Sequence, residues 1–397
     1  MDKKQEYIFM YKDFEVFRFE ADFESKKATL LEKLEHFDKG PYLISKKDAN
    51  LEYGVTKFFQ RRTIPDTRRG QKEILAATGC ENEFELSFKG HGLSLSNHYW
   101  FKKEGENLRY KDINFFENKW DDTFARAVLS ADYEALKHAS LEVPDIVTQG
   151  WATKGWIYDN GPKLYKLGID PDHSEESLGE VLASLLARRI FKKGEVLEYE
   201  LGKWGEKYAS VSPTMVGDKE ELTHLSDVLP HSLYMLYSSR NRDKNMRAEF
   251  FEILKDYRLP ELYPLFVKLT CLRSICFVHD LHFDNIALIR NVETGDYHPA
   301  PFFDLAGSFG GTTTGKSFLS NINKATYMII YFLYSGLDPE WDYSWYDPAK
   351  LEGFEEVIRG MLSKSDFYTP QLIDNIIDVY HHQKETLDEY WENDKKK

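Results

Sequence analysis

Cysteine is scarce in this sequence, whose 397 residues contain only Cys80, Cys271 and Cys276. Three irregularly spaced cysteines are too few for a disulfide-bonded scaffold or a four-thiolate zinc site. Long hydrophobic runs are missing as well, because the most apolar window, TYMIIYFLYSGL from Thr326, spans about twelve residues and is too short to cross a bilayer. Charged residues interrupt every apolar run in the opening stretch MDKKQEYIFMYKDFEVF, so we expect no signal peptide. These absences predict a soluble, cytoplasmic protein with no membrane partner.

Positive charge is also in deficit. Lysine and arginine number 52 against 66 aspartates and glutamates, which gives a formal net charge of −14. Only short segments such as RRTIPDTRRG are notably basic, and this argues against direct nucleic-acid binding. With 42% hydrophobic and 15% aromatic residues, the chain can bury the cores of two or three domains.

Residues 1–140 mix two kinds of short segment. The runs EYIFMY, FEVFRFEADF, ELSFKG and HYWFKK are strand-like, whereas KATLLEKLEHF and RRGQKEILAAT have helical spacing. This mixture predicts an N-terminal α+β accessory module.

The remainder of the chain predicts two further regions. In residues 141–215, strand-like runs flank the turn Asp159-Asn160-Gly161, a helix is expected over SLGEVLASLLARRI, and EVLEYELGKWGEKYASVSPTM returns to strand-like character. This pattern predicts a small β-rich lobe with one helix. Residues 216–397 are mostly helical in pattern and predict a helical lobe that is interrupted by one polar loop.

That loop, CFVHDLHFDNIALI from Cys276 to Ile289, places polar residues inside a run that is otherwise apolar enough for a core. Burial of such groups is costly unless something pairs with them or uses them. One interpretation is a metal site, because His279, Asp280, His282 and Asp284 offer nitrogen and oxygen ligands close together. No second motif such as H-E-x-x-H supplies further ligands.

A kinase-type phosphoryl-transfer site is another interpretation. Asp280 and Asn285 are spaced on one loop like the base and the Mg²⁺-binding amide of a kinase catalytic loop. Asp304 follows in APFFDLAG, where a strand-like run ends in a carboxylate suited to Mg²⁺. Upstream, Lys166 lies on the second strand of the hairpin and would bind the phosphates of ATP, while Glu180 on the following helix would hold that lysine.

Two alternatives remain open at this point. Glu180 follows Ser177 at the spacing of a capping box, so it could close the start of its helix, and Glu176 is a rival partner for the lysine. The segment GGTTTGKS, which contains Lys316, matches the letters of a nucleotide-binding P-loop. The residues after Ser317 are almost wholly helical in pattern, whereas a P-loop NTPase needs further parallel strands and a strand-borne carboxylate.

These residues resemble a known family. DLHFDNIALI and HPAPFFDLAGS are similar to the Asp-x-His-x-x-Asn and Ala-Pro-x-x-Asp motifs of HipA-like serine/threonine kinases, whose best-known members are bacterial toxin kinases. Upstream, RRTIPDTRRGQKEIL and LSLSNHYWFKKEGENLRYKDINFFENKWDD resemble the N-terminal module of a firmicute- and phage-type HipA-like group. QGWATKGWIYDNGPKLYKLG with SEESLGEVLASLLARRI resembles its phosphate-loop hairpin, lysine strand and helix. The likeness covers about residues 55–320.

The resemblance implies an α+β, two-lobed protein-kinase-like fold with the accessory module at residues 1–140, the small lobe at 141–215 and the large lobe at 216–397. It implies that Asp280 is the catalytic base, that Asn285 and Asp304 bind Mg²⁺, and that Lys166 is the ATP lysine. His282 is expected beside Asp280 as a residue that braces the catalytic loop.

The phosphates would be covered by the loop from Gly150 to Gly155, which includes Thr153 and Lys154. In the toxin kinases this loop carries an autophosphorylated serine, whereas here only Thr148 and Thr153 offer a hydroxyl. We therefore expect ATP- and Mg²⁺-dependent phosphorylation of a Ser or Thr hydroxyl on a protein, with autophosphorylation. An antitoxin-like partner is compatible with this reading. The alternatives are a catalytically inactive pseudokinase that serves as a nucleotide-binding interaction module, and a P-loop NTPase that uses Lys316.

Overall fold

The structure is a computed structural model, and it describes residues 3–47, 49–229, 252, 254, 255, 259–278, 282–320 and 341–396. The chain divides into two compact units. Unit 1 comprises Met1–Ile169, Pro213–Thr223 and Ile289–Tyr297, and unit 2 comprises Asp170–Ser212, His224–Leu288 and His298–Lys397. The predicted three-part division at residues 140/141 and 215/216 stays a prediction.

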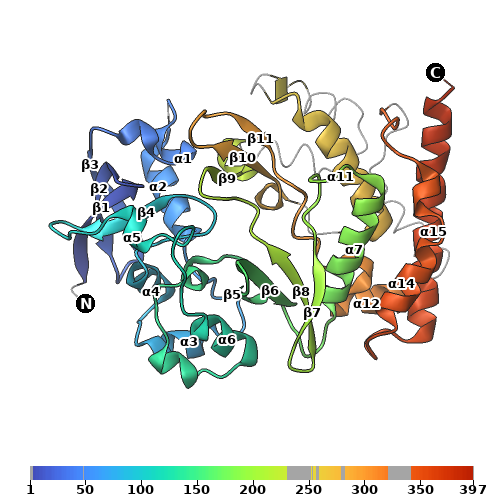
Figure 1. Cartoon of the computed structure of the whole chain (residues 1–397), viewed down its shortest axis with the longest axis horizontal. Coiled ribbons are helices and arrows are strands. Elements are labelled where there is room, and N and C mark those ends of the chain that lie inside the picture. The colour runs from blue at the N-terminus through green and yellow to red at the C-terminus, as the bar shows by residue number, and fades with distance from the viewer. Residues whose placement is uncertain are drawn as a thin grey trace. The chain divides into compact units, whose positions relative to one another are not determined.

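Unit 1 is built on a four-stranded antiparallel sheet of order β3-β2-β1-β4 (Figure 1). Its strands are β1 (Lys4–Tyr11), β2 (Phe14–Asp22), β3 (Lys27–Lys33) and β4 (Tyr99–Lys103). The register places Phe9 opposite both Phe17 and Phe101, and a bulge follows Phe9 in the β1–β2 pair. The strand-like runs EYIFMY, FEVFRFEADF and HYWFKK are therefore confirmed as strands.

Both faces of this sheet are buried, which explains why β1 is apolar without alternation. Because side chains alternate between faces along a strand, Tyr7, Phe9 and Tyr11 enter one core while Ile8 and Met10 enter another. Most residues of the first core are aromatic, and its Phe9 and Phe17 rings stack with centroids 4.4 Å apart. Aromatic pairs of this kind contribute stability beyond the area that they bury.

Short helices cover the sheet and complete the two cores of unit 1. They are η1 (Phe37–Lys39), α1 (Tyr42–Ser45), α2 (Leu51–Gln60), α3 (Gln71–Thr78), α4 (Glu83–Lys89), α5 (Tyr110–Ile113), α6 (Thr123–Ser130), η2 (Ala135–His138) and η3 (Pro144–Val147).

Two predictions about this unit were wrong. KATLLEKLEHF has helical spacing, but residues 27–33 form β3 at the edge of the sheet, where β3 pairs with β2. ELSFKG is strand-like, but it belongs to helix α4, which begins after Asn82. The Asn82 side chain accepts a hydrogen bond from the Glu85 N–H (2.9 Å) and thereby caps the helix.

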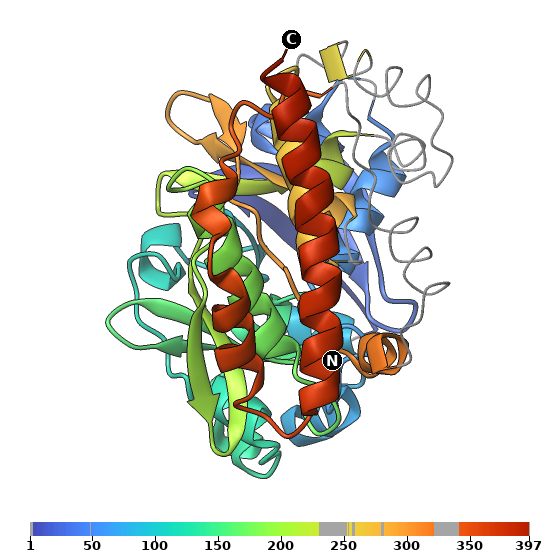
Figure 2. The same ribbon diagram turned by 90° about the vertical axis from the view of Figure 1, so that its right-hand side faces the viewer.

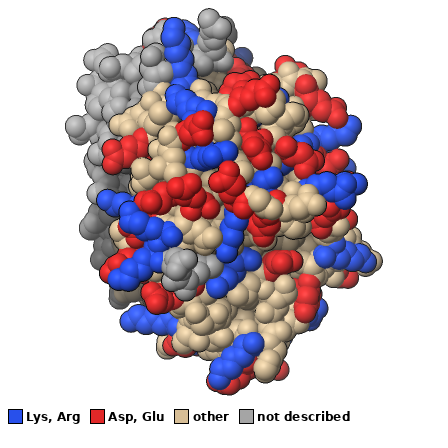
Figure 3. Space-filling view, turned by 90° about the vertical axis from the view of Figure 1, so that its left-hand side faces the viewer, with Lys and Arg blue, Asp and Glu red and all other residues tan. Residues whose placement is uncertain are grey.

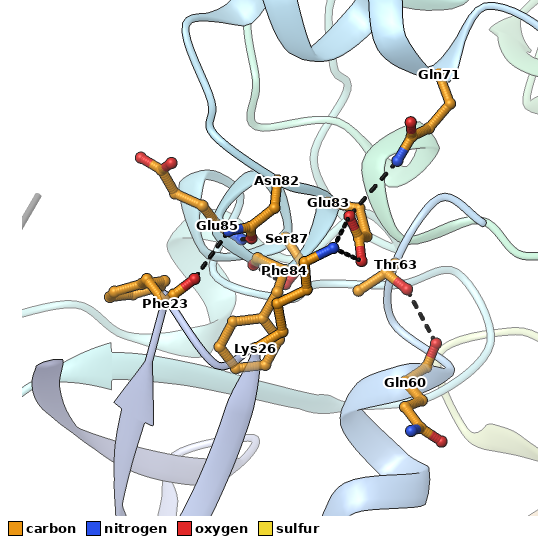
Figure 4. A network of polar contacts seen from close by, with 10 residues as sticks. All are labelled: Phe23, Lys26, Gln60, Thr63, Gln71, Asn82, Glu83, Phe84, Glu85 and Ser87. Carbon is orange, nitrogen blue, oxygen red and sulfur yellow. Dashed lines mark hydrogen bonds and ion pairs between the residues drawn. The ribbon is translucent and has the colours of Figure 1, made fainter. Parts of the chain in front are cut away.

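Figure 4 shows how α4 is fixed to its neighbours. The Asn82 side-chain amide donates to the Phe23 carbonyl at the end of β2 (2.8 Å), and Lys26 on the following turn forms an ion pair with Glu83 (2.9 Å). Gln71 at the start of α3 also reaches the Glu83 carboxylate, at 3.5 Å. The start of α4 is thus tied both to the sheet and to a second helix.

The predicted hairpin of unit 1 is confirmed. Strand β5 (Thr153–Tyr158) pairs antiparallel with β6 (Pro162–Gly168), and the turn between them contains Asn160 and Gly161 at positive φ. Asparagine and glycine tolerate this left-handed conformation better than other residues. The start of β5 packs on α6, where a Cβ at Gly155 would lie 2.9 Å from the Ala125 Cβ.

Unit 2 is mainly helical. Its helices are α7 (Glu176–Ile190), α8 (Leu225–Val228), α11 (Leu262–Cys276), η4 (Phe283–Asn285), η5 (Ser308–Gly310), α12 (Thr313–Ser320), η6 (Pro348–Leu351), α14 (Phe354–Leu362) and α15 (Pro370–Asp394). Figure 2 shows the long α15 beside α14. One apolar core joins α7, α11, α14 and α15 through residues such as Leu182, Leu272, Ile358 and Ile376. The predicted helices at α7, α11 and α14 are confirmed.

The predicted helix LSDVLPHSLYMLY is described only up to residue 229, MRAEFFEILKDY is described only at residues 252, 254 and 255, and SNINKATYMIIYFLY lies outside the described residues apart from Ser320.

The remaining strands are short. Strands β7 (Glu200–Trp204) and β8 (Lys207–Pro213) form an antiparallel hairpin, as expected from their strand-like pattern. A three-stranded sheet has the order β11-β10-β9, and its strands are β9 (Glu220–His224), β10 (Ala287–Asn291) and β11 (Tyr297–Pro299).

All three cysteines are free and buried. Burial raises the pKa of the Cys80, Cys271 and Cys276 thiols above the ordinary value. Across the described residues, no helix has the length and apolarity that a bilayer span requires.

Candidate functional site

The polar loop of unit 2 follows helix α11. The helix ends at Phe277, whose positive φ of 60° turns the chain away from the helix axis. His279, Asp280 and Leu281 lie outside the described residues, so the assignment of Asp280 as catalytic base stays a prediction. From His282 onward the chain is described again, and it enters the short η4 turn at Phe283.

Asp284 fixes this loop to the preceding segment of unit 2. Its carboxylate accepts a hydrogen bond from the Ser226 hydroxyl (2.5 Å), and its backbone carbonyl hydrogen-bonds with the His224 ring (2.7 Å). This role could not be predicted from the sequence, because neither His224 nor Ser226 belongs to a recognisable motif. Asp284 therefore has a structural function that accounts for one polar residue in an otherwise apolar run.

His282 and Asn285 are held within the same turn. The His282 ring nitrogen Nδ1 accepts from the Asp284 N–H (3.2 Å), and the Asn285 N–H donates to the His282 carbonyl (2.8 Å). The Asn285 side chain is buried at 8% exposure. The His282 contact is of the kind that braces a loop, and the predicted roles of both residues stay predictions.

Asp304 lies where the chain makes an unusual turn. Its φ is +55°, a left-handed conformation that is uncommon for residues other than glycine. Its backbone N–H donates to the Tyr199 hydroxyl (3.1 Å). The predicted strand before it is reduced to one bridge, between Phe302 and Val196. Since strained backbone concentrates at functional sites, this geometry is compatible with the predicted role of Asp304.

The segment after Asp304 packs tightly against the start of α7. The Glu175 N–H donates to the Gly311 carbonyl (2.8 Å). A Cβ at Gly179 would lie 2.2 Å from the Ser308 carbonyl oxygen, and one at Gly311 would lie 2.9 Å from the Glu175 carbonyl oxygen. Glycine at both positions lets the two backbones approach closely, so α7 and the segment 308–311 are held together.

Glu180 lies in the second turn of α7 and is only 1% exposed. Its carboxylate accepts a short hydrogen bond of 2.5 Å from the Ser210 hydroxyl on β8. The capping-box interpretation of Glu180 is wrong, because α7 begins at Glu176 and Ser177 is already inside the helix. The predicted pairing of Glu180 with Lys166 stays a prediction, as does the rival role of Glu176.

In unit 1, the β5–β6 hairpin brings two lysines together. The register places Lys154 directly opposite Lys166, with a bulge before Lys154. Directly opposed residues of an antiparallel pair project from the same face. Lys166 is buried at 7% exposure. The Lys154 ammonium lies over Gly150, where a Cβ would be only 2.6 Å from Nζ.

The loop before β5 is held from inside unit 1 by Arg68. The Arg68 guanidinium donates to the Thr148 carbonyl (2.5 Å) and, through Nε and Nη2, to the Gly150 carbonyl (2.9 and 2.7 Å). Burial lowers the pKa of Arg68 to about 10. RRTIPDTRRG is one of the notably basic segments of the sequence, but its Arg62 and Arg68 are both buried at 4% exposure.

Asp145 and Thr153 add two unusual buried polar groups near this loop. The Asp145 Oδ1 accepts from the Trp156 N–H (2.8 Å), whereas its Oδ2 and the Thr153 hydroxyl are buried without a hydrogen-bond partner in the part of the chain that the structure describes. Burial raises the pKa of Asp145 to about 7, although the positive charge of Arg68 counteracts that effect.

Neither alternative chemistry gains support. The described ranges contain no group of three or more His, Cys, Asp or Glu side chains that could hold a metal ion, and His279 and Asp280 fall outside those ranges. The last five residues of GGTTTGKS form the start of α12, and the Lys316 ammonium lies 4.2 Å from the centre of the Phe367 ring. Instead of a full strand before this segment, there is only the single bridge at Phe302 and the short η5 turn.

The predicted residues therefore fall into two groups, one in each unit. In unit 1, Gly150, Thr153, Lys154 and Lys166 lie on one loop and the hairpin that follows it. In unit 2, the turn with His282 and Asn285, the turn at Asp304 and the helix that carries Glu180 are each held by hydrogen bonds or close packing. Arg68 and Tyr199 were missed from the sequence alone, because an arginine or a tyrosine that contacts such a site carries no motif of its own.

Comparisons with known proteins identify the type of fold. No protein-family model and no curated protein sequence matches this chain. Its structure is similar to HipA in the complex of HipA, HipB and operator DNA from Shewanella oneidensis MR-1. That match has a TM-score of 0.52 at 11% identity and covers 97% of this chain and 99% of HipA. A second similar structure is the proinflammatory kinase CtkA of Helicobacter pylori, with a TM-score of 0.39 at 13% identity over 62% of this chain and 93% of CtkA.

The likeness to HipA extends over nearly the whole chain and shows the fold. The protein has a mixed α+β, kinase-like fold of the HipA type, with antiparallel sheets and a helical portion. The fold prediction is thereby confirmed.

Proposed function

We propose that this protein is an ATP- and Mg²⁺-dependent kinase that transfers the γ-phosphoryl group of ATP to a Ser or Thr hydroxyl on a protein. In this proposal Lys166 and the loop from Gly150 to Gly155, which includes Thr153 and Lys154, bind the phosphates. Asn285 and Asp304 bind Mg²⁺, and Asp280 accepts the proton of the attacking hydroxyl. The HipA-type fold supports the proposal, because these residues occur in the order that such a kinase requires.

One observation carries the proposal, namely the opposed lysines of the β5–β6 hairpin. Like charges directly opposite each other on neighbouring strands destabilise a sheet. The hairpin places Lys154 opposite Lys166, and the Lys154 ammonium lies over the backbone of Gly150. Positive charge is thereby concentrated beside a glycine-containing loop. Two ammonium groups beside such a loop suit the binding of a phosphate group.

The residues assigned to Mg²⁺ fit that ion chemically. Asn285 offers an amide oxygen and Asp304 a carboxylate oxygen, which are the ligand types that Mg²⁺ prefers. When bound, the ion would neutralise charge on the phosphates during transfer. Hydrogen bonds of the backbone hold both residues in place. The Asn285 N–H donates to the His282 carbonyl, and the Asp304 N–H donates to the Tyr199 hydroxyl.

Autophosphorylation and a partner complete the proposal. The HipA structure of Shewanella oneidensis also contains HipB and operator DNA. By analogy, we propose an antitoxin-like protein partner for this chain. Because the net charge of this chain is −14, contacts with DNA would be made by that partner.

The test is phosphate transfer from radiolabelled ATP in the presence of Mg²⁺, followed by mass spectrometry of the modified residue. Asp280→Ala and Asp304→Asn should each lower transfer by about 100-fold or more, since they remove the base and a metal ligand. Lys316→Ala is the matched comparison, and it should retain wild-type transfer.

The opposite pattern, with activity lost in Lys316→Ala and kept in Asp280→Ala, would show a P-loop NTPase. Nucleotide binding by the wild-type protein without any phosphate transfer would instead identify a pseudokinase. Either result would refute the proposed function.

A further inference from the structure

Thr148, the first residue of the loop 148–152, is held by the segments on both sides of the loop. On one side, the Thr148 N–H donates to the Asp145 carbonyl (3.1 Å) and the Thr148 hydroxyl donates to the Pro144 carbonyl (2.8 Å). On the other side, the Trp156 indole N–H donates to the Thr148 hydroxyl (3.0 Å). These contacts hold Thr148 and do not involve Gln149, Gly150 or Trp151.

The middle of the loop is instead held by a distant part of unit 1. Arg68 lies between α2 and α3, where its backbone N–H donates to the Pro65 carbonyl (3.0 Å) and its carbonyl accepts from the Gln71 N–H (3.1 Å). From this fixed position its buried guanidinium contacts the carbonyls of both Thr148 and Gly150. Gln60, at the end of α2, also contacts the loop. Its backbone carbonyl accepts a hydrogen bond from the side-chain amide of Gln149 (3.1 Å).

These contacts set the direction of the peptide groups. In a trans peptide the N–H points opposite to the C=O of the same unit. With the Thr148 and Gly150 carbonyls turned inward to Arg68, the N–H groups of Gln149 and Trp151 must point away from the interior. Neither N–H donates a hydrogen bond to any residue in the described ranges, and the Trp151 side chain is 58% exposed. Successive outward N–H groups are a common way to bind an anion.

We propose that Arg68 is a positioning residue that holds the loop 148–152 in the conformation that receives the phosphates of ATP. The inference rests on the proposed function, and it adds that the accessory segment around α2 and α3 contributes to the nucleotide site. Arg68 itself does not contact the phosphates in this proposal. Its guanidinium suits the task because a planar fork can reach two carbonyls at once, which a lysine ammonium does less well.

Three variants test the proposal. Arg68→Gln removes the charge, Arg68→Lys keeps the charge and loses the fork, and Arg69→Gln is the matched control, since Arg69 is the exposed neighbour of Arg68. The first readout does not depend on kinase activity. It is the rate of chymotrypsin cleavage after Trp151, identified by mass spectrometry. Cleavage after Tyr53 on α2 is the reference, because Tyr53 is similarly exposed at 56%. The second readout is the KM for ATP and the kcat of phosphate transfer.

For Arg68→Gln we expect cleavage after Trp151 to become about ten-fold faster, with a KM for ATP about ten-fold higher and a nearly unchanged kcat, because charged hydrogen bonds to the loop are lost. Arg68→Lys should fall between Arg68→Gln and the wild type, and Arg69→Gln should match the wild type. If Arg68→Gln does not fold, Arg68→Lys decides by the same two readouts.

Wild-type cleavage and KM in a folded Arg68 variant would overturn the proposal. Faster cleavage with an unchanged KM would also overturn it, because Arg68 would then support the loop without positioning it for ATP. If the wild-type protein transfers no phosphate, the proposed function fails, and the cleavage readout alone then decides whether Arg68 holds the loop.

Discussion

Burial changes the chemistry of individual charged residues in unit 1. The pKa of Arg62 is lowered to about 9 and that of Arg68 to about 10 because both guanidinium groups are removed from water. Each offsets this cost with hydrogen bonds to backbone carbonyls, Arg62 to Gly92 and Tyr99 and Arg68 to the loop 148–152. Two of the arginines that make RRTIPDTRRG look basic therefore contribute to the interior rather than to a surface that could attract anions.

Asp145 leads to a prediction about stability and pH. Burial raises its pKa to about 7, whereas an unfolded aspartate titrates near pH 3.9. Between about pH 4 and 7 the native state therefore keeps a proton that the unfolded chain has lost. In this range the residue lowers the free energy of unfolding as the pH rises, and above about pH 7 its effect is constant.

Asp145→Asn keeps an oxygen that can accept from the Trp156 N–H but does not titrate. The free energy of unfolding of this variant, relative to the wild type, should therefore increase between about pH 4.5 and 7.5, by a few kcal/mol at most. Urea unfolding at several pH values measures the difference, and titration of the half-buried Glu175 and the buried Glu221 is common to both proteins. Parallel pH dependences in the two proteins would contradict the prediction.

At the scale of elements, α7 and the segment 308–311 are closely packed against each other in unit 2. This contact joins the helix that carries Glu180 to the chain that continues from Asp304, and it depends on glycine on both sides. Because two backbones meet there without a side chain between them, small displacements of one element must move the other.

This packing predicts opposite effects for two helical glycines. Gly179→Ala places a Cβ 2.2 Å from the Ser308 carbonyl oxygen and should lower the free energy of unfolding by about 1–3 kcal/mol. Gly360→Ala is the control, because Gly360 is exposed on α14 and a Cβ there meets nothing within 4 Å. It should be stabilising by about 0.5–1 kcal/mol, since alanine favours a helix. Urea unfolding of both variants tests this, and equal effects would contradict it.

Local patterns predicted most elements but not those that depend on distant partners. The helix over α7 and the hairpin at Asn160-Gly161 follow from local spacing and turn chemistry, so they were predictable. Residues 27–33 form an edge strand because β2 lies beside them, which overrides their helical spacing. Helix α4 did carry a local signal, the Asn82 cap three residues before Glu85, and this signal outweighs the strand-like look of ELSFKG.

The candidate site was predictable only in part, for a related reason. Residues with motif spacing, such as Asn285, Asp304 and Lys166, could be named from the sequence, and their roles stay predictions. Supporting residues such as Arg68 and Ser226 could not be named, because their contacts join segments far apart in the sequence. The geometry around Asp280 lies outside the described residues.

At the scale of the whole molecule, the charge distribution bears on partners. The face of the molecule in Figure 3 shows lysines and arginines interspersed with aspartates and glutamates. Several basic residues of the sheet of unit 1 form ion pairs, among them Lys4 with Glu20, Arg18 with Glu104 and Lys102 with Glu15. Binding to duplex DNA relies on uncompensated positive charge.

The chain alone should therefore not bind duplex DNA. In an electrophoretic mobility assay at about 0.15 M salt, about 10 μM protein should leave DNA unshifted, because a net charge of −14 opposes association with phosphates. Sub-micromolar binding that weakens as salt increases would contradict this. DNA binding that requires a second protein would remain compatible with the proposed partner.

The three buried cysteines make the folded protein unreactive toward thiol reagents, because each thiol is shielded and its raised pKa disfavours the nucleophilic thiolate. A single cysteine introduced at an exposed position would then be the one site that a maleimide dye or a spin label modifies. Placed in the loop 148–152, such a label would report the movement of that loop directly, without removal of any native residue from the cores.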